Sequence, residues 1–216
     1  MIVYWLLLLP VAFVGYLSGS ISTMRVASRF VFHKNLRRLG TGNLFLSNFR
    51  RLYGWWGAVK LLLVEIIKDM LPILLGALLL AIKKHADVGA AFGAFCMLMG
   101  RLWPLFNGFK ASHHGAVALA AALLSVEVSV GASAALVMLI VIWFTRYLSL
   151  GVAAGALIAV VTALLTVDDR LVMLLAIFCA ALVLVHEIPA LLRMSQGKEE
   201  RLSFEQDISY KFDEKF

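Results

Sequence analysis

Long runs without a charged side chain are the feature that most constrains this chain. Residues 1–24 contain no Asp, Glu, Lys or Arg, and further uncharged runs follow at 88–100, 115–126, 128–145, 147–167 and 171–185. A helix that crosses the hydrocarbon core of a bilayer needs about 20 predominantly apolar residues, with about 17 as the lower end. Several runs are that long, so they predict an integral membrane protein.

The composition supports this class. The chain is 62% hydrophobic and 15% charged, whereas soluble domains are about 45–50% apolar and about 25% charged. Residues 1–24 lack the basic start and the small-residue cleavage site of a signal peptide, so we expect them to be retained. Cys96 and Cys179 lie in apolar runs and are predicted to be small core residues. No basic and aromatic pattern indicates a nucleic-acid partner.

Charges, glycines and prolines divide the apolar sequence into spans. We predict an all-α compact bundle of about seven transmembrane helices, near residues 2–24, 54–82, 86–103, 114–128, 131–146, 148–167 and 170–189. A reading with five spans would merge some of them. We expect residues 1–195 to form the transmembrane domain and residues 196–216, which carry charges of both signs, to form a cytoplasmic tail.

The basic residues predict the orientation of this bundle. Outside the spans, most lysines and arginines fall in the loop 25–53, the loop near 101–113, the junction at Arg146 and the tail, while the opposite side holds Lys83, Lys84 and Arg170. Because cytoplasmic loops are enriched in Lys and Arg, the richer side is predicted to be cytoplasmic. The N-terminus is then outside and the C-terminus inside.

Four ionisable residues lie inside the second predicted span. Ionisable groups at membrane depth cost several kcal/mol unless they are paired or hydrated, about 2.5–3.5 kcal/mol on insertion scales. Glu65 precedes Lys68 by three residues and Asp69 by four, so all three share one helix face with a possible Glu65–Lys68 pair. Two interpretations are open: a polar face that lines a cavity, or a structural ion pair inside the bundle. Lys60 lies one turn earlier.

The loop "LRRLGTGNLFLSNFRRLYG" is both glycine-rich and basic. It places Gly40 and Gly42 between arginine pairs at 37–38 and 50–51. Glycines let backbone N–H groups approach an anion, and arginine binds its oxygens in a bidentate way. Such a loop suits a phosphate group, although basic cytoplasmic loops also serve topology alone.

Taken together, these segments resemble the bacterial acyl-phosphate-dependent glycerol-3-phosphate acyltransferases, the PlsY family. The first family signature corresponds to "YLSGSIS" at Tyr16–Ser22 and "GTGNLFLSN" at Gly40–Asn48, with Arg51 three residues later. An Asp-x-x-Lys pattern in the second helix corresponds to Glu65 and Lys68, followed by "MLP". The segment "GRLWPLFNGFKASHHGAVA" occupies the next signature. Arg146 and Ser149 match an Arg-x-x-Ser pair, and Arg193, Gly197 and Glu199 match the last signature.

The resemblance covers about residues 15–200 in consistent order, and it implies both a fold and an activity. The implied fold is a small seven-helix bundle with a cytoplasm-facing site in the bacterial inner membrane. The implied reaction moves an acyl chain from acyl phosphate to the sn-1 hydroxyl of glycerol 3-phosphate, giving lysophosphatidic acid and inorganic phosphate. The family needs no metal or coenzyme, and we expect a monomer in the lipid bilayer.

The same resemblance implies the site residues. The residues expected at the reacting groups are Ser20, Asn43, His113 and Ser149. The residues expected to bind substrate, with the cations on phosphate, are Thr41, Gly42, Asn48, Arg51, Lys68, Lys110 and Arg146. Phosphate is already a good leaving group, so much of the rate can come from holding the hydroxyl near the acyl carbon.

Departures from the family pattern gather near the expected chemistry. The replaced positions are Phe45, Leu46, Arg101, Ala111, Ser112, His113, His114, Glu187 and Ala190. Arg101 and Glu187 stand where the family has histidine, and His113 stands where it has lysine. Three hypotheses follow: an active acyltransferase with a remodelled phosphate site, a transferase with another acceptor or donor, or a non-enzymatic membrane paralogue that binds a lipid or partner.

Overall fold

The computed structural model describes residues 2–31, 33, 46–109 and 127–199, and it describes no side chains at residues 2–5 and 46–52. All regular secondary structure in these ranges is helical, which confirms the predicted class. The elements are α1 (Ile2–Ser20), α2 (Thr23–Phe30), α3 (Leu46–Ala81), α4 (Ala86–Leu102), the 3-10 turn η2 (Leu105–Asn107), α6 (Val128–Thr145), α7 (Leu148–Thr166) and α8 (Arg170–Ser195).

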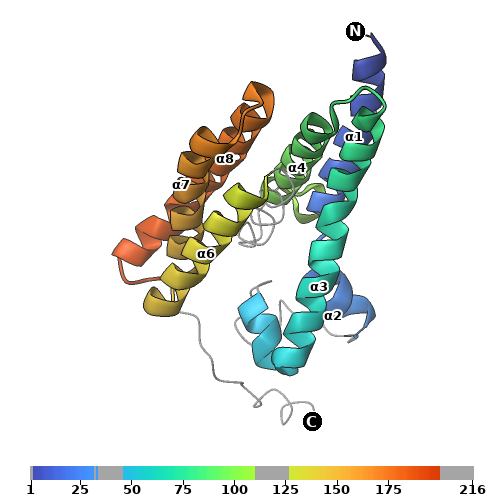
Figure 1. Ribbon diagram of the computed structural model, residues 1–216. Helices are drawn as coiled ribbons and strands as arrows, with labels where there is room; N and C mark the ends of the chain where they lie inside the picture. The colour runs from blue at the N-terminus through green and yellow to red at the C-terminus, as the bar shows by residue number, and fades with distance from the viewer. Residues whose placement is uncertain (1, 32, 34–45, 110–126, 200–216) are drawn as a thin grey trace.

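The helices form two groups that meet through α4 and α8. In Figure 1, α1 and α3 lie beside α4 on one side, and α6, α7 and α8 lie together on the other. The short helix α2 lies beside the N-terminal half of α3 and contacts it (Figure 1). Because α4 packs against α1, α3 and α8, residues of α4 are placed to join the two groups.

Four described segments are long and apolar enough to cross a membrane: Ala86–Asn107, Val128–Thr145, Leu148–Thr166 and Arg170–Ser195. The bent pair Leu6–Ser20 and Thr23–Phe30, with an angle of 57°, makes a fifth if it is one broken span. The helix α3 has 36 residues but is not among these segments, because its C-terminal half contains three charged residues, Glu65, Lys68 and Asp69. The span predicted at 114–128 falls almost wholly outside the described residues, so the number seven stays a prediction.

Several helix limits differ from those predicted, and α6 begins at Val128, three residues before its predicted start. The first span does not run straight to residue 24, because α1 ends at Ser20 and the chain bends into α2. The helix α3 begins at Leu46, although Gly54 (φ 76°, ψ −179°) interrupts it at the predicted start of the span. The helix α8 continues through Pro189 to Ser195, six residues beyond the predicted end.

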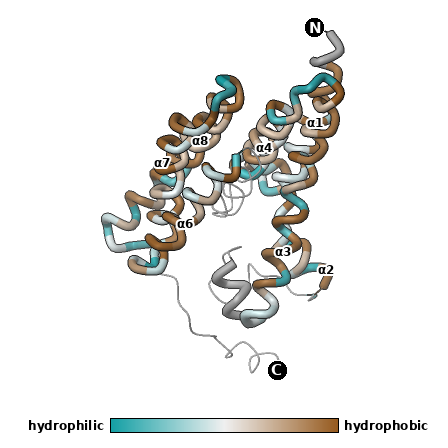
Figure 2. Tube along the Cα trace, in the orientation of Figure 1, coloured by the Kyte–Doolittle hydropathy of each residue, from teal (hydrophilic) through white to brown (hydrophobic). Residues whose placement is uncertain are grey.

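Buried and exposed side chains are distributed as in a protein surrounded by lipid. The core is rich in alanine, including Ala94, Ala134, Ala156, Ala163 and Ala180. Large apolar side chains point outward instead, and Trp143 and Phe144 are 75% and 80% exposed. Apolar residues cover most of the helices in Figure 2. Small residues between helices with large apolar residues outside are typical of membrane bundles, because lipid offers no hydrophobic drive for helix association.

The α1–α4 contact depends on glycine at the point where the two backbones approach. A Cβ atom built on Gly19 would overlap the carbonyl oxygen of Met97, and one built on Gly100 would overlap that of Tyr16. The clash would be with backbone atoms, which cannot rotate away as a side chain can. This close approach brings the end of α1, where Ser20 lies, directly onto the end of α4.

Replacing Gly19 with alanine is expected to lower the free energy of unfolding by about 1–3 kcal/mol, since the added methyl group forces α1 away from α4. Unfolding by SDS titration in detergent micelles measures this change. Leu9→Ala is the matched control on α1, because Leu9 is 65% exposed and exposed positions usually change stability by less than about 0.5 kcal/mol. Equal losses for the two variants would contradict the close contact.

Candidate active site

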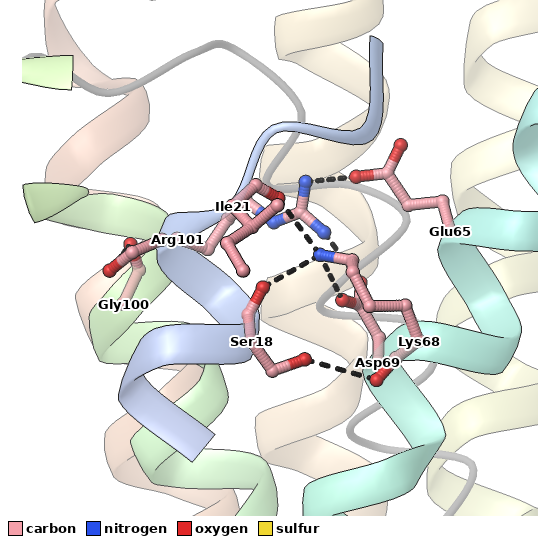
Figure 3. A network of polar contacts seen from close by, with 8 residues as sticks. Ser18, Ile21, Glu65, Lys68, Asp69, Gly100 and Arg101 are labelled. Atoms are coloured by element: carbon pink, nitrogen blue, oxygen red, sulfur yellow. Dashed lines mark hydrogen bonds and ion pairs between the residues drawn. The ribbon is translucent and has the colours of Figure 1, made fainter. Parts of the chain in front are cut away.

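Polar groups from α1, α3 and α4 meet in the interior of the first helix group (Figure 3). Lys68 on α3 donates hydrogen bonds to the carbonyl oxygens of Ser18, at 2.8 Å, and Ile21, at 3.1 Å. Its ammonium also lies 2.9 Å from a carboxylate oxygen of Asp69. In return, the Ser18 hydroxyl donates to the Lys68 carbonyl oxygen at 3.0 Å. The end of α1 and the middle of α3 are therefore joined by several polar contacts.

Arg101 completes this network from α4. Its guanidinium donates one hydrogen bond to Glu65 and another to Asp69, the latter at 2.5 Å. Arg101, Glu65 and Asp69 are 3%, 3% and 0% exposed. Among the described residues, two carboxylates and two cations thus gather here, and their formal charges balance. Buried ions need such partners, because removal from water costs several kcal/mol for each ion.

The network bears on the two interpretations of the charges in the second span. These charges are paired inside the bundle, as the ion-pair interpretation predicts, but the predicted pairing of Lys68 with Glu65 needs correction. Glu65 pairs with Arg101, and Lys68 pairs with Asp69. Helix spacing alone does not predict the partner from α4, because Arg101 lies in the sequence at the start of a basic loop and at a replaced family position. A rule that buried charges need partners would have pointed to Arg101, which directly follows the uncharged run 88–100.

Ser20 lies beside this network at the last position of α1. Its hydroxyl donates to the carbonyl oxygen of Gly100 at 3.3 Å, and the residue is 2% exposed. The structure therefore brings together Ser20 and Lys68, two of the predicted site residues. It adds Asp69 and Arg101, which were not predicted there.

Contacts from α1 and α2 also hold the turn after α4. The Tyr16 hydroxyl donates to the carbonyl oxygen of Trp103 at 2.9 Å. Arg25 donates to the carbonyl oxygen of Phe106 at 2.7 Å and to the side-chain oxygen of Asn107. Gly108 closes η2 in a left-handed conformation (φ 62°). The bend between α1 and α2 thus fixes the chain just before residue 110, where the predicted Lys110 and His113 begin a part outside the described residues.

A second group of predicted residues lies at the junction of α6 and α7. Arg146 ends α6 in a left-handed backbone conformation (φ 60°, ψ 15°), and its side chain is exposed. Ser149, three residues later, is 4% exposed, and its hydroxyl is buried without a hydrogen-bond partner among the described residues. A non-glycine residue in this conformation costs about 1–2 kcal/mol, and a left-handed residue is a common way for a helix to end. The buried hydroxyl of Ser149 beside this arginine favours a ligand site at the junction.

The end of α8 carries the last predicted signature. Arg193 and Glu199 form an ion pair at 2.9 Å, and Gly197 between them has a positive φ of 68°. Glu187 and Ala190 are both buried, at 3% and 2% exposure. The two family positions that differ here are thus interior positions of the bundle.

Several predicted residues cannot be placed in the same way. Thr41, Gly42, Asn43, Lys110 and His113 lie outside the described residues, as do the departures at Phe45, Ala111, Ser112 and His114. Asn48 and Arg51 lie on α3 before the Gly54 interruption, in the stretch without described side chains. Their predicted roles stay predictions.

These features define a class: a multi-helix integral membrane protein with a buried ionic network and polar helix junctions. The chain belongs to the glycerol-3-phosphate acyltransferase family, whose sequence profile matches residues 9–197. This match confirms the resemblance described for the sequence.

Individual relatives agree with the family assignment. Glycerol-3-phosphate acyltransferase 2 of Moorella thermoacetica is 32% identical over 92% of this chain and 97% of its own length. The glycerol-3-phosphate acyltransferase of Paraburkholderia xenovorans is 28% identical over 90% of each chain. Two crystal structures of PlsY (YgiH), an integral membrane glycerol 3-phosphate acyltransferase, match in fold. Its glycerol 3-phosphate form has a TM-score of 0.75 and 26% identity over 91% of this chain and 96% of the other. Its lysophosphatidic acid form has a TM-score of 0.74 and 25% identity over 90% and 94%.

Proposed function

We propose that this protein transfers an acyl chain from acyl phosphate to glycerol 3-phosphate and so makes lysophosphatidic acid for phospholipid synthesis. The hydroxyl oxygen of glycerol 3-phosphate forms a bond to the acyl carbon, the bond from that carbon to phosphate breaks, and the hydroxyl proton leaves with inorganic phosphate. The family match over nearly the whole chain supports this reaction. It does not favour a membrane paralogue without catalysis.

The observation that carries the proposal is the α6–α7 junction. Ser149 presents a buried hydroxyl without a partner among the described residues, three positions after an arginine held in a strained conformation. An arginine can bind phosphate oxygens in a bidentate way, and a free hydroxyl can hydrogen-bond to a substrate. Arg146 then binds a substrate phosphate and Ser149 orients the bound molecule. Arg51 and Lys110 supply further positive charge from the basic segments.

The same charges support a cytoplasmic site. The basic segments 25–53 and 101–113 and the junction at Arg146 belong to the side of the chain with the greater Lys and Arg content. Cytoplasmic loops carry such an excess, and glycerol 3-phosphate, a small anion, reaches a site there from the aqueous phase. The acyl chain of the donor stays in the bilayer, which the exposed apolar side chains of the helices face.

The test is an assay of the purified full-length protein with palmitoyl phosphate and labelled glycerol 3-phosphate. We expect labelled lysophosphatidic acid and an equal amount of inorganic phosphate. Phosphate release that requires an added acceptor other than glycerol 3-phosphate would contradict the proposed acceptor. The absence of any phosphate release would contradict the transferase activity itself. Reaction with an acyl thioester and none with acyl phosphate would contradict the proposed donor.

A further inference from the structure

The Lys68 ammonium contacts three oxygen atoms of the protein. It donates hydrogen bonds to the carbonyl oxygens of Ser18 and Ile21, at 2.8 and 3.1 Å, and forms an ion pair with a carboxylate oxygen of Asp69 at 2.9 Å. A lysine ammonium has three donors and no acceptor. A substrate phosphate would therefore have to compete with these three oxygens for Lys68.

The two carbonyl groups lie where α1 breaks. The last helical bond at this end joins the Ile21 N–H to the Leu17 carbonyl oxygen, and α2 then leaves at an angle of 57°. A break of this kind leaves carbonyl oxygens without their usual N–H partner four residues later. In a bilayer, each unpaired backbone group costs several kcal/mol. Lys68 supplies the missing donors from α3, so the bend at residues 20–22 is closed by a side chain of another helix.

Arg101 controls whether Lys68 can donate to the carbonyl groups of the bend. One carboxylate oxygen of Asp69 forms an ion pair with Lys68, and the other accepts a hydrogen bond from Arg101. Glu65 and Asp69 together carry two negative charges, and Arg101 provides the second positive charge that balances them. Without Arg101, Lys68 would be the remaining cation beside these carboxylates among the described residues, and it would be drawn away from the carbonyl groups.

We propose that Glu65, Lys68, Asp69 and Arg101 form a charge-balanced cluster that holds the α1–α2 bend, and that Lys68 supports catalysis by positioning Ser20 rather than by binding phosphate. The kinetic part of this proposal rests on the proposed function, whereas its structural part does not. Asp69 and Arg101 are positioning residues that act through Lys68. The arginine at the family's histidine position is thus committed to the interior of the protein.

The structural part is tested by labelling a cysteine placed at the bend. Ser22→Cys is half-buried between α1 and α2, and the native Cys96 and Cys179 are buried. Adding Lys68→Met should raise the rate of maleimide labelling at residue 22 about tenfold, because the bend then opens more often. Lys60→Met is the matched control, since Lys60 is exposed on the same helix, and should leave the labelling rate unchanged. Arg101→Lys, which keeps the charge balance, should stay within about threefold of the native rate.

The kinetic part separates positioning from phosphate binding. In Lys68→Met we expect kcat to fall about tenfold while the KM for glycerol 3-phosphate changes less than about threefold. An increase in KM with unchanged kcat and unchanged labelling would overturn the proposal in favour of a phosphate ligand. If Lys68→Met is not recovered folded, the double variant Lys68→Met/Asp69→Asn, which keeps Glu65 and Arg101 as a balanced pair, replaces it and should show the same faster labelling. If the native protein transfers no acyl group, the proposed function fails, and the labelling rates still decide the role of the cluster.

Discussion

Replacing Arg101 with methionine is expected to lower the free energy of unfolding by about 3–5 kcal/mol, because the change leaves a buried carboxylate without its cation. Arg101 is 3% exposed and binds both Glu65 and Asp69, so no water can take its place easily. Methionine keeps much of the side-chain volume and therefore tests the charge rather than the packing. SDS titration in detergent micelles measures the loss.

A double variant that also neutralises Asp69 is the control for this prediction. In Asp69→Asn/Arg101→Met the cluster is neutral again, with Glu65 and Lys68 as its remaining charges. The double variant should therefore be more stable than Arg101→Met alone, although it has lost more polar contacts. Arg170→Met, at an exposed arginine that starts α8, should be close to native. A double variant at least as unstable as the single variant would show that charge balance is not what Arg101 provides.

Replacing Arg146 with glycine is expected to separate stability from activity. Glycine adopts the left-handed conformation of this position without a Cβ penalty, which is about 1–2 kcal/mol for other residues. The variant should therefore be at least as stable as the native protein. Its kcat/KM for glycerol 3-phosphate should nevertheless fall about 100-fold, because a charge-assisted bond to phosphate is lost.

Initial rates at varied glycerol 3-phosphate concentrations, together with SDS unfolding, test this expectation. Arg170→Met removes an arginine from the other predicted side of the membrane and is the matched control for a general loss of positive charge. It should change kcat/KM by less than about twofold, since salt screens distant charges. Native kinetics in Arg146→Gly would mean that the strained conformation serves another purpose.

The fold class could be predicted because it depends on patterns that are local in the sequence. The uncharged run 171–185 is long and apolar enough to form a helix in any bilayer, and α8 contains it. Lys83 and Lys84 mark the turn after α3, because charged residues disfavour the continuation of an apolar helix. Gly54 marks the interruption within α3, because glycine adopts backbone conformations outside the helical region. Limits that depend on tertiary contacts were predicted less well, as the continuation of α8 through Pro189 shows.

The candidate site shows the same division. Lys68 and Ser20 could be singled out from their residue types and spacing, and they do lie near each other, since Lys68 binds the carbonyl groups of Ser18 and Ile21 on either side of Ser20. Their partners could not be deduced in this way. The spacing of three residues predicted a Glu65–Lys68 pair, but Arg101 is more than thirty positions away and takes Glu65 as its own partner. Likewise, nothing in "SGSIS" shows that α1 breaks there and that two of its carbonyl oxygens accept from a lysine.

The sequence by itself thus determined that this chain is a bundle of membrane helices with basic segments on one predicted side, since insertion into lipid responds to the apolar length and charge of each segment separately. Only the tertiary structure decided which of the buried charged side chains form ion pairs with each other. That choice depends on the close packing of α4 against α1, at Gly19 and Gly100, and against α3, at Gly76 and Gly89. This packing sets Arg101 beside Glu65 and Asp69 and leaves Lys68 for the carbonyl groups of the bend.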